Sequence, residues 1–176
     1  MLVDCFWNDA GRVCGRFCGQ ESKGIRNLKP DVYKGIYRVC SLYFSKFQKP
    51  VMITSGWRSL RQTAEIMALL SVSQLKGMYC RHGCPDYIRS IVLKREVLGT
   101  VLSEDDVYSI LQNRKEGYIS RHLFGAAVDL SCEDMKLDEL NLMLKQCGFS
   151  VFNEQALGVE CLHASYSAEA PVIIRI

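Results

Sequence analysis

The stretch SRHLFGAAVDL, at residues 120–130, contains the most informative pattern of the chain. It includes His122 and Asp129, separated by small residues that let the chain turn and let the two side chains converge. Residues 127–131, which include Asp129, are typical of a β-strand. Because histidine and carboxylate side chains are standard zinc ligands, the stretch predicts a metal site beside a strand.

The segment ECLH, at residues 160–163, supplies further groups of the same chemistry. His163 lies in another predicted strand, and Glu160 stands three positions before it. A catalytic zinc site keeps three protein ligands and leaves one position open. On an extended strand Glu160 and His163 would point to opposite faces. Both can therefore serve one metal only if the strand ends, bends or carries a bulge between them.

A third segment, SGWRS at residues 55–59, follows a short β-prone run and contains Arg58. Each segment taken alone has an ordinary structural explanation. A histidine, a glycine and an aspartate near one turn are usually structural, and Glu-x-x-His arises by chance.

Together the three segments resemble the D-alanyl-D-alanine carboxypeptidase family of zinc peptidases, which shares its fold with the Hedgehog signalling domain. That family has Ser-Gly-aromatic-Arg-Ser, then Ser-x-His-x-x-Gly-x-Ala-x-Asp, then Glu-x-x-His. Residues 55–59, 120–129 and 160–163 match these motifs in this order, and the middle match is the most specific. The resemblance spans residues 51–165 but rests on these three islands.

The resemblance implies a ligand set and a base. His122, Asp129 and His163 would hold one Zn²⁺ per chain, and Glu160 would be the general base that activates the attacking water. Arg58 would stabilise the developing oxyanion or hold a substrate carboxylate, because a guanidinium is always charged and offers forked donors.

Two more residues would belong to the substrate site. Ser120 would hydrogen-bond the terminal carboxylate of the peptide, and Gln62 would steady Arg58, although a plain surface glutamine explains Gln62 equally well. Leu162 stands where the family usually has an aromatic residue. Since that residue shapes the pocket in the family, we expect Leu162 to alter substrate preference.

Hydrophobic periodicity and turn signals predict the fold class. Ser103, with Asp106 three residues later, predicts a capping box at the start of one helix. Helices come first and strands later, which indicates an α+β domain with helices packed on a small antiparallel sheet; the resemblance makes it Hedgehog/DD-peptidase-like. The predicted helices are residues 31–47, 60–70, 104–112 and 137–146, and the predicted strands are residues 51–54, 127–131, 149–152, 159–164 and 172–176.

The length of 176 residues is that of one ordinary domain. We therefore expect a single zinc peptidase domain over residues 1–176. Within it, residues 1–28 would form irregular structure or short strands, and residues 71–119 an insertion or lid.

The composition excludes several classes of protein. Hydrophobic residues make up 48% and charged residues 23%, as in globular proteins. No apolar run approaches the roughly 18 residues that a membrane span needs. The net charge of +3 is too small, and its basic residues too scattered, to favour a nucleic-acid partner. We expect a monomer that has a peptide substrate as its partner.

The nine cysteines are odd in number and scattered, which predicts free thiols in a reducing compartment. Cys80-x-His82-x-Cys84 has a spacing that could bind a metal, but a loop with buried thiols is the simpler explanation. Asp4 and Asn8 interrupt the apolar stretch that a cleavable signal peptide needs. We therefore expect synthesis in the cytoplasm and action on the cell wall only after release.

The leading functional hypothesis is a peptidase that cuts peptidoglycan stem peptides at or near D-alanine, as a phage-type lysis or entry enzyme (endolysin) would. A cytosolic D-alanyl-D-alanine dipeptidase is an alternative within the same family. A non-catalytic zinc-binding domain of the same fold and a thiol-rich binding protein without zinc are alternatives from other classes.

Overall fold

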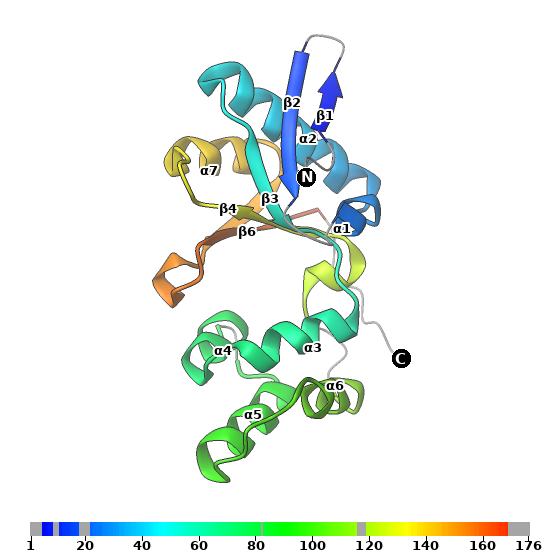
Figure 1. Cartoon of the computed structure of the whole chain (residues 1–176), viewed down its shortest axis with the longest axis vertical. Helices are drawn as coiled ribbons and strands as arrows, with labels where there is room; N and C mark the ends of the chain where they lie inside the picture. The colour runs from blue at the N-terminus through cyan, green and yellow to red at the C-terminus, as the bar shows by residue number, and fades with distance from the viewer. Residues whose placement is uncertain (1–4, 9–10, 18–21, 82, 116–118, 169–176) are drawn as a thin grey trace. The chain divides into compact units, whose positions relative to one another are not determined.

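The computed structural model describes residues 5–8, 11–17, 22–81, 83–115 and 119–168. The chain forms two compact units (Figure 1). Of the described residues, those from 5 to 57 and from 121 to 168 form the sheet unit, and those from 58 to 120 form the helical unit. None of the helices in the described ranges combines the length and the apolar character that crossing a bilayer requires.

The sheet unit is built on a sheet of six strands in the order β1-β2-β3-β4-β6-β5 (Figure 1). Strands β2 and β3 run parallel, and all other neighbours are antiparallel. The mixture of helix and strand is consistent with the α+β expectation, but the sheet is larger than expected and has one parallel pair. Its strands are β1 (Cys5–Asn8), β2 (Gly11–Phe17), β3 (Val51–Ser55), β4 (Ala127–Ser131), β5 (Phe149–Asn153) and β6 (Cys161–Tyr166).

The first two strands belong to the segment 1–28, for which irregular structure and short strands were both expected; the described part contains short strands and a short helix. The strand predicted at residues 172–176 lies outside the described residues. The helices of the sheet unit are α1 (Ser22–Arg26), α2 (Pro30–Phe47) and α7 (Leu137–Gln146), with the 3-10 turns η3 (Arg121–Phe124) and η4 (Gln155–Leu157).

The core of the sheet unit lies between α2, α7 and one face of the sheet. Helix α2 starts with Pro30, whose fixed φ suits the first helical position, and ends where Gln48 adopts a left-handed conformation. Its buried residues recur at helical spacing, as predicted. Leu42, although apolar, is 40% exposed. The buried residues of α2 are Val32, Ile36, Val39, Cys40 and Tyr43.

The two central strands β4 and β6 place alternate residues on opposite faces of the sheet. Leu130 on β4 and Leu162 on β6 belong to the hydrophobic core. Their strand neighbours Asp129 and His163 therefore project from the face that α2 and α7 do not cover. Asp129 and His163 are also directly paired across the two strands, so the sheet register brings these two ligand candidates together.

The helical unit contains the segment 71–119, which was expected to be an insertion or lid. Three of its helices begin with a reciprocal capping box, in which the side chain of the N-cap serine and a side chain three residues later satisfy each other's backbone N–H groups. The box predicted at Ser103 and Asp106 is one of them. The elements are α3 (Leu60–Leu69), α4 (Val72–Tyr79), α5 (Asp86–Val92), the π-helix η2 (Leu93–Val97) and α6 (Glu104–Gln112).

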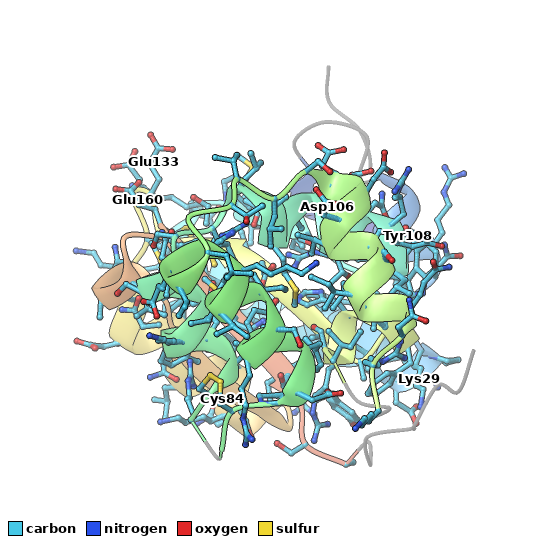
Figure 2. The ribbon with its side chains drawn as sticks, turned by 90° about the horizontal axis from the view of Figure 1, so that it is seen from below. Lys29, Cys84, Asp106, Tyr108, Glu133 and Glu160 are labelled. Atoms are coloured by element: carbon cyan, nitrogen blue, oxygen red, sulfur yellow. A yellow bond between two sulfur atoms is a disulfide. The ribbon has the colours of Figure 1, made fainter. Side chains whose placement is uncertain are left out.

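Cys80 and Cys84 form a disulfide in the helical unit (Figure 2). The prediction of free thiols is therefore wrong for this pair. Helix α4 ends at Tyr79, and Gly83 follows with a φ of +106°, so the chain turns back within a few residues and brings the two sulfur atoms together. His82 lies outside the described residues. The cysteines recorded as free are Cys40, Cys132, Cys147 and Cys161.

The Arg95 guanidinium binds the end of helix α3. It donates hydrogen bonds to the carbonyl oxygens of Met67 at 3.2 Å, Ala68 at 2.8 Å and Leu70. These are carbonyls of the last turn, which have no intrahelical partner.

We expect Arg95→Met to lower the free energy of unfolding of the helical unit by about 1.5–3 kcal/mol, because it removes charged hydrogen bonds to partly buried carbonyls. Denaturant unfolding and hydrogen exchange of the α3 amides measure this effect. Lys94→Met, which changes an exposed neighbour, is the matched control. Equal stability of the two variants would contradict the capping role of Arg95.

Candidate metal centre

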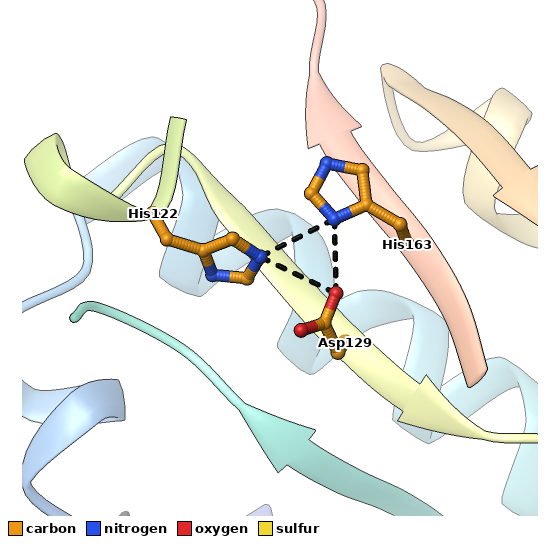
Figure 3. Close-up of side chains that lie close together, drawn as sticks. All are labelled: His122, Asp129 and His163. Atoms are coloured by element: carbon orange, nitrogen blue, oxygen red, sulfur yellow. Dashed lines mark hydrogen bonds and ion pairs between the residues drawn. The ribbon is translucent and has the colours of Figure 1, made fainter. Parts of the chain in front are cut away.

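Three side chains of the sheet unit converge on one point (Figure 3). His122 Nε2 lies 3.2 Å from His163 Nδ1 and 3.3 Å from Asp129 Oδ1, and His163 Nδ1 lies 2.9 Å from the same oxygen. Within the described ranges, they form the one group of three or more His, Cys, Asp or Glu residues that could hold a metal ion. The three residues predicted as metal ligands are therefore brought together.

The three candidate ligands come from different elements. His122 lies on η3, a single turn directly before β4, while Asp129 and His163 are cross-strand partners on β4 and β6. His122 is 1% exposed and Asp129 6% exposed, whereas the side chain of His163 is 24% exposed. The cluster is thus buried on two sides and accessible beside His163.

The second ring nitrogen of His122 determines its tautomer. His122 Nδ1 lies 2.5 Å from the carbonyl oxygen of Gly56, which can only accept a hydrogen bond. The proton of the neutral ring therefore sits on Nδ1, and Nε2 presents a lone pair to the cluster. This is the arrangement of a metal-binding histidine whose other nitrogen donates to the protein.

Close backbone packing holds the Gly56 carbonyl in place. A Cβ at Gly56 would lie 2.7 Å from the carbonyl oxygen of Gly24, which accepts a hydrogen bond from the N–H of Trp57 at 2.8 Å. Trp57 Nε1 also donates to the carbonyl oxygen of Leu123, at 3.0 Å. The Ser-Gly-Trp part of the first motif thus orients His122, a role that sequence reasoning missed because the group involved is a backbone carbonyl.

The donor set fits a divalent cation. Donor atoms bound at about 2.0–2.2 Å in a tetrahedron lie about 3.3–3.6 Å apart, and the observed separations of 2.9–3.3 Å require only a small expansion. Two neutral imidazoles and one carboxylate also supply one negative charge to a buried site. A cation is the natural partner for lone pairs that converge in this way.

Glu160, the predicted general base, lies outside this cluster of three. It is exposed and stands directly before β6, and the N–H of Cys161 donates to the carbonyl of Val159 at 2.8 Å, which makes a tight turn at Glu160. The chain therefore bends at Glu160. A bend, a bulge or a strand end near Glu160 and His163 was the condition for both residues to serve one metal. Figure 2 shows the side chain of Glu160 directed outward.

Cys161 shares the ligand face of β6 with His163 but is not one of the three residues that converge. Burial, and then the negative charge of Asp129, raise the pKa of the Cys161 thiol well above its ordinary value. The protonated thiol donates to Glu154 Oε2 at 3.0 Å. Cys161 is therefore a buried hydrogen-bond donor on the same face of the sheet as the site.

Leu162 does not face the ligand cluster, and its effect on substrate preference stays a prediction. Leu162 is 2% exposed and packs into the core, on the face of β6 opposite to His163. The aromatic residue beside the ligands is Phe152 on β5, which is paired directly with His163. Directly paired residues share a face of the sheet, so Phe152 flanks the site where Leu162 cannot.

The remaining predicted site residues belong to the helical unit. Arg58 and Ser120 are its first and last residues before the chain passes into the sheet unit, and both are half-buried. Gln62 Oε1 accepts a hydrogen bond from the backbone N–H of Ser59 at 2.9 Å, as part of the capping box of α3. The structure thus assigns Gln62 a local role, and the substrate contacts of all three stay predictions.

Family models, curated protein sequences and solved structures provide no match to this chain, so the interpretation of the site rests on its own residues and their geometry.

Proposed function

We propose that this protein is a zinc-dependent peptidase that hydrolyses peptidoglycan stem peptides at or near D-alanine, in the manner of a phage-type cell-wall lysis or entry enzyme. The single observation that carries the proposal is the convergence of His122 Nε2, Asp129 Oδ1 and His163 Nδ1 within 3.3 Å of one another. The Hedgehog/DD-peptidase-like architecture is part of the same proposal.

Zinc is the metal that this donor set favours. Imidazole nitrogens together with one carboxylate suit zinc, and three protein ligands leave a position for catalysis. A zinc ion bound there would supply Lewis-acid polarisation for the hydrolysis of an amide. Other parts of the chain orient the three candidate ligands. The carbonyl of Gly56 orients His122, and the sheet register orients Asp129 and His163.

The resemblance of the three motifs supplies the substrate class. In this proposal Glu160 accepts a proton from the attacking water and passes it to the leaving amine. Arg58 and Ser120 keep the substrate-binding roles that the resemblance implies, whereas the side chain of Gln62 caps α3.

A non-catalytic zinc-binding domain is the second candidate. The observation in its favour is the position of Glu160, which is exposed and lies outside the cluster of candidate ligands. A domain that only binds zinc needs no general base beside the metal, so a Glu160 that lies outside the cluster is compatible with such a domain.

Incubation of the zinc-loaded protein with peptidoglycan fragments and with free D-alanyl-D-alanine tests the proposed substrate. We expect release of D-alanine or of shortened stem peptides from the fragments, with loss of product when a chelator removes the metal. Product from the free dipeptide alone would overturn the lysis role and favour the dipeptidase. Bound zinc without hydrolysis of either substrate would favour the non-catalytic domain.

Glu160→Gln tests the base. The amide keeps the size of the side chain but cannot accept the proton, so we expect hydrolysis to fall by about 10²–10⁴-fold. Zinc content should stay unchanged, because Glu160 is not among the candidate ligands. The measurements are the initial rate of amine release and the metal content of the purified variant.

Glu133→Gln is the matched control, since Glu133 is also an exposed carboxylate of the sheet unit. We expect this variant to retain the full rate. An equal rate for Glu160→Gln and the unaltered protein would remove Glu160 from the mechanism.

A further inference from the structure

The second ring nitrogen of His163 has a partner that the motifs do not include. His163 Nε2 lies 2.9 Å from Ser165 Oγ, while His163 Nδ1 faces the ligand cluster. Ser165 is two residues further along β6, so its side chain projects from the same face of the strand. The imidazole of His163 is thereby held between Asp129 on one side and the serine hydroxyl on the other.

The neighbouring strands leave room for this contact. Ala127 on β4 is directly paired with Ser165 and is fully buried, and its methyl group occupies little of the space next to the hydroxyl. On the other side Ser150 of β5 is also paired with Ser165, but the Ser150 hydroxyl lies 2.8 Å from that of Ser167. Two serines thus stand side by side on one face of the sheet, and one of them contacts the ligand histidine.

We propose that Ser165 is a positioning residue that holds the His163 ring in the orientation needed for metal binding and accepts a hydrogen bond from Nε2–H in the metal-binding tautomer. An imidazole can bind a cation only through an unprotonated nitrogen, so the proton of His163 must sit on Nε2 when Nδ1 is a ligand. Ser165 Oγ accepts a hydrogen bond from that N–H. The inference rests on the proposed zinc site and adds a fourth residue to it.

The two histidines are held by different kinds of group. The carbonyl of Gly56 can only accept, so it admits a single tautomer of His122. A serine hydroxyl both donates and accepts, so Ser165 accommodates either tautomer of His163 and accepts from Nε2–H when a metal occupies the Nδ1 side. Metal binding therefore selects the tautomer of His163, whereas the Gly56 carbonyl fixes the tautomer of His122 before any metal binds.

Zinc affinity of the full-length chain, measured by competition with a chromophoric chelator at one fixed pH, tests the role of Ser165. Partners of metal-bound histidines typically contribute 10–100-fold to affinity. We expect Ser165→Ala to weaken zinc binding by at least about tenfold. Ser165→Thr, which keeps the hydroxyl in a residue suited to a strand, should restore most of the affinity.

Ser150→Ala is the matched control, because it removes a hydroxyl from the paired position of the next strand. We expect it to bind zinc as the unaltered chain does. ¹⁵N chemical shifts of the His163 ring, recorded with zinc bound, give a second measurement: Nε2 should be the protonated nitrogen.

The outcomes separate this inference from the proposed function. If the unaltered chain binds zinc and Ser165→Ala binds it equally well, the role of Ser165 is overturned while the zinc site stands. A similar loss in Ser165→Ala, Ser165→Thr and Ser150→Ala would indicate general damage to the sheet and would also overturn it. Failure of the unaltered chain to bind zinc would overturn the zinc site itself, and the role of Ser165 with it.

Discussion

Replacing His122 with alanine is expected to abolish stoichiometric zinc binding. The unaltered chain should hold about one zinc ion, as a site with three protein ligands does. Binding free energies of protein zinc sites are about 10–16 kcal/mol, so the loss of one ligand in three removes about 4 kcal/mol. At about 1.4 kcal/mol per factor of ten, the affinity should fall by about 10³-fold. Metal analysis after mild purification and chelator competition measure the change.

His82→Ala provides the matched control, because His82 is the one histidine of the sequence outside the candidate ligand set. That variant should keep its zinc. Circular dichroism of His122→Ala checks that the chain still folds, since the substitution also removes a buried ring that bonds the Gly56 carbonyl. Retention of one zinc ion by a folded His122→Ala variant would contradict the assigned site.

Gly125→Ala is expected to cause the largest loss of stability. Gly125 has a φ of +70°, a left-handed conformation that costs an L-residue about 1–2 kcal/mol. A Cβ there would also collide with the carbonyl oxygen of Asn27, a backbone atom that cannot rotate away. Overpacking of this kind costs about 1–3 kcal/mol more. We therefore expect the free energy of unfolding of the sheet unit to fall by about 3 kcal/mol, measured by denaturant titration.

Gly148→Ala separates the two contributions. Gly148 has a similar φ of +89°, but a Cβ there would meet a ring carbon of Tyr166 at 3.1 Å, which can shift. We expect a loss of about 1–2 kcal/mol from the backbone conformation alone. Equal losses at the two positions would show that the contact with Asn27 contributes nothing.

Gly125 also affects the metal site, because it ends the turn that carries His122. The N–H of Gly125 donates to the carbonyl of His122 at 3.1 Å, and its own carbonyl accepts from the N–H of Lys29 at 3.0 Å. Any displacement of this turn moves the His122 ring. Metal affinity and stability should therefore fall together in Gly125→Ala, and only stability should fall in Gly148→Ala.

Part of the local structure could be predicted from the sequence to within a few residues, whereas α1, α4, α5 and η2 were not predicted. The predicted helix at residues 137–146 and the strand at residues 127–131 coincide with α7 and β4, and the capping box at Ser103 lies where expected. These features depend on neighbours along the chain, such as helical spacing of apolar residues and an N-cap serine. The choice of His122, Asp129 and His163 as ligand candidates likewise came from their motifs.

The alternation of side chains along a strand also predicts the face of Leu162, as it does for Glu160 and His163. A residue next to His163 must point to the opposite face, so the sequence already placed Leu162 in the core. The same alternation puts Ser165 on the face of His163.

The sequence by itself determined which side chains could bind a metal and where α2, α3, α6, α7 and the strands from β3 to β6 lie to within a few residues. Only the tertiary structure decided that β4 and β6 pair in the register that joins Asp129 to His163, that the Gly56 carbonyl meets His122, and that Phe152 flanks the site. It also decided the Cys80–Cys84 disulfide. The physical reason is range: periodicity and capping act between residues a few positions apart, whereas register and side-chain convergence depend on how segments distant in the chain pack against each other.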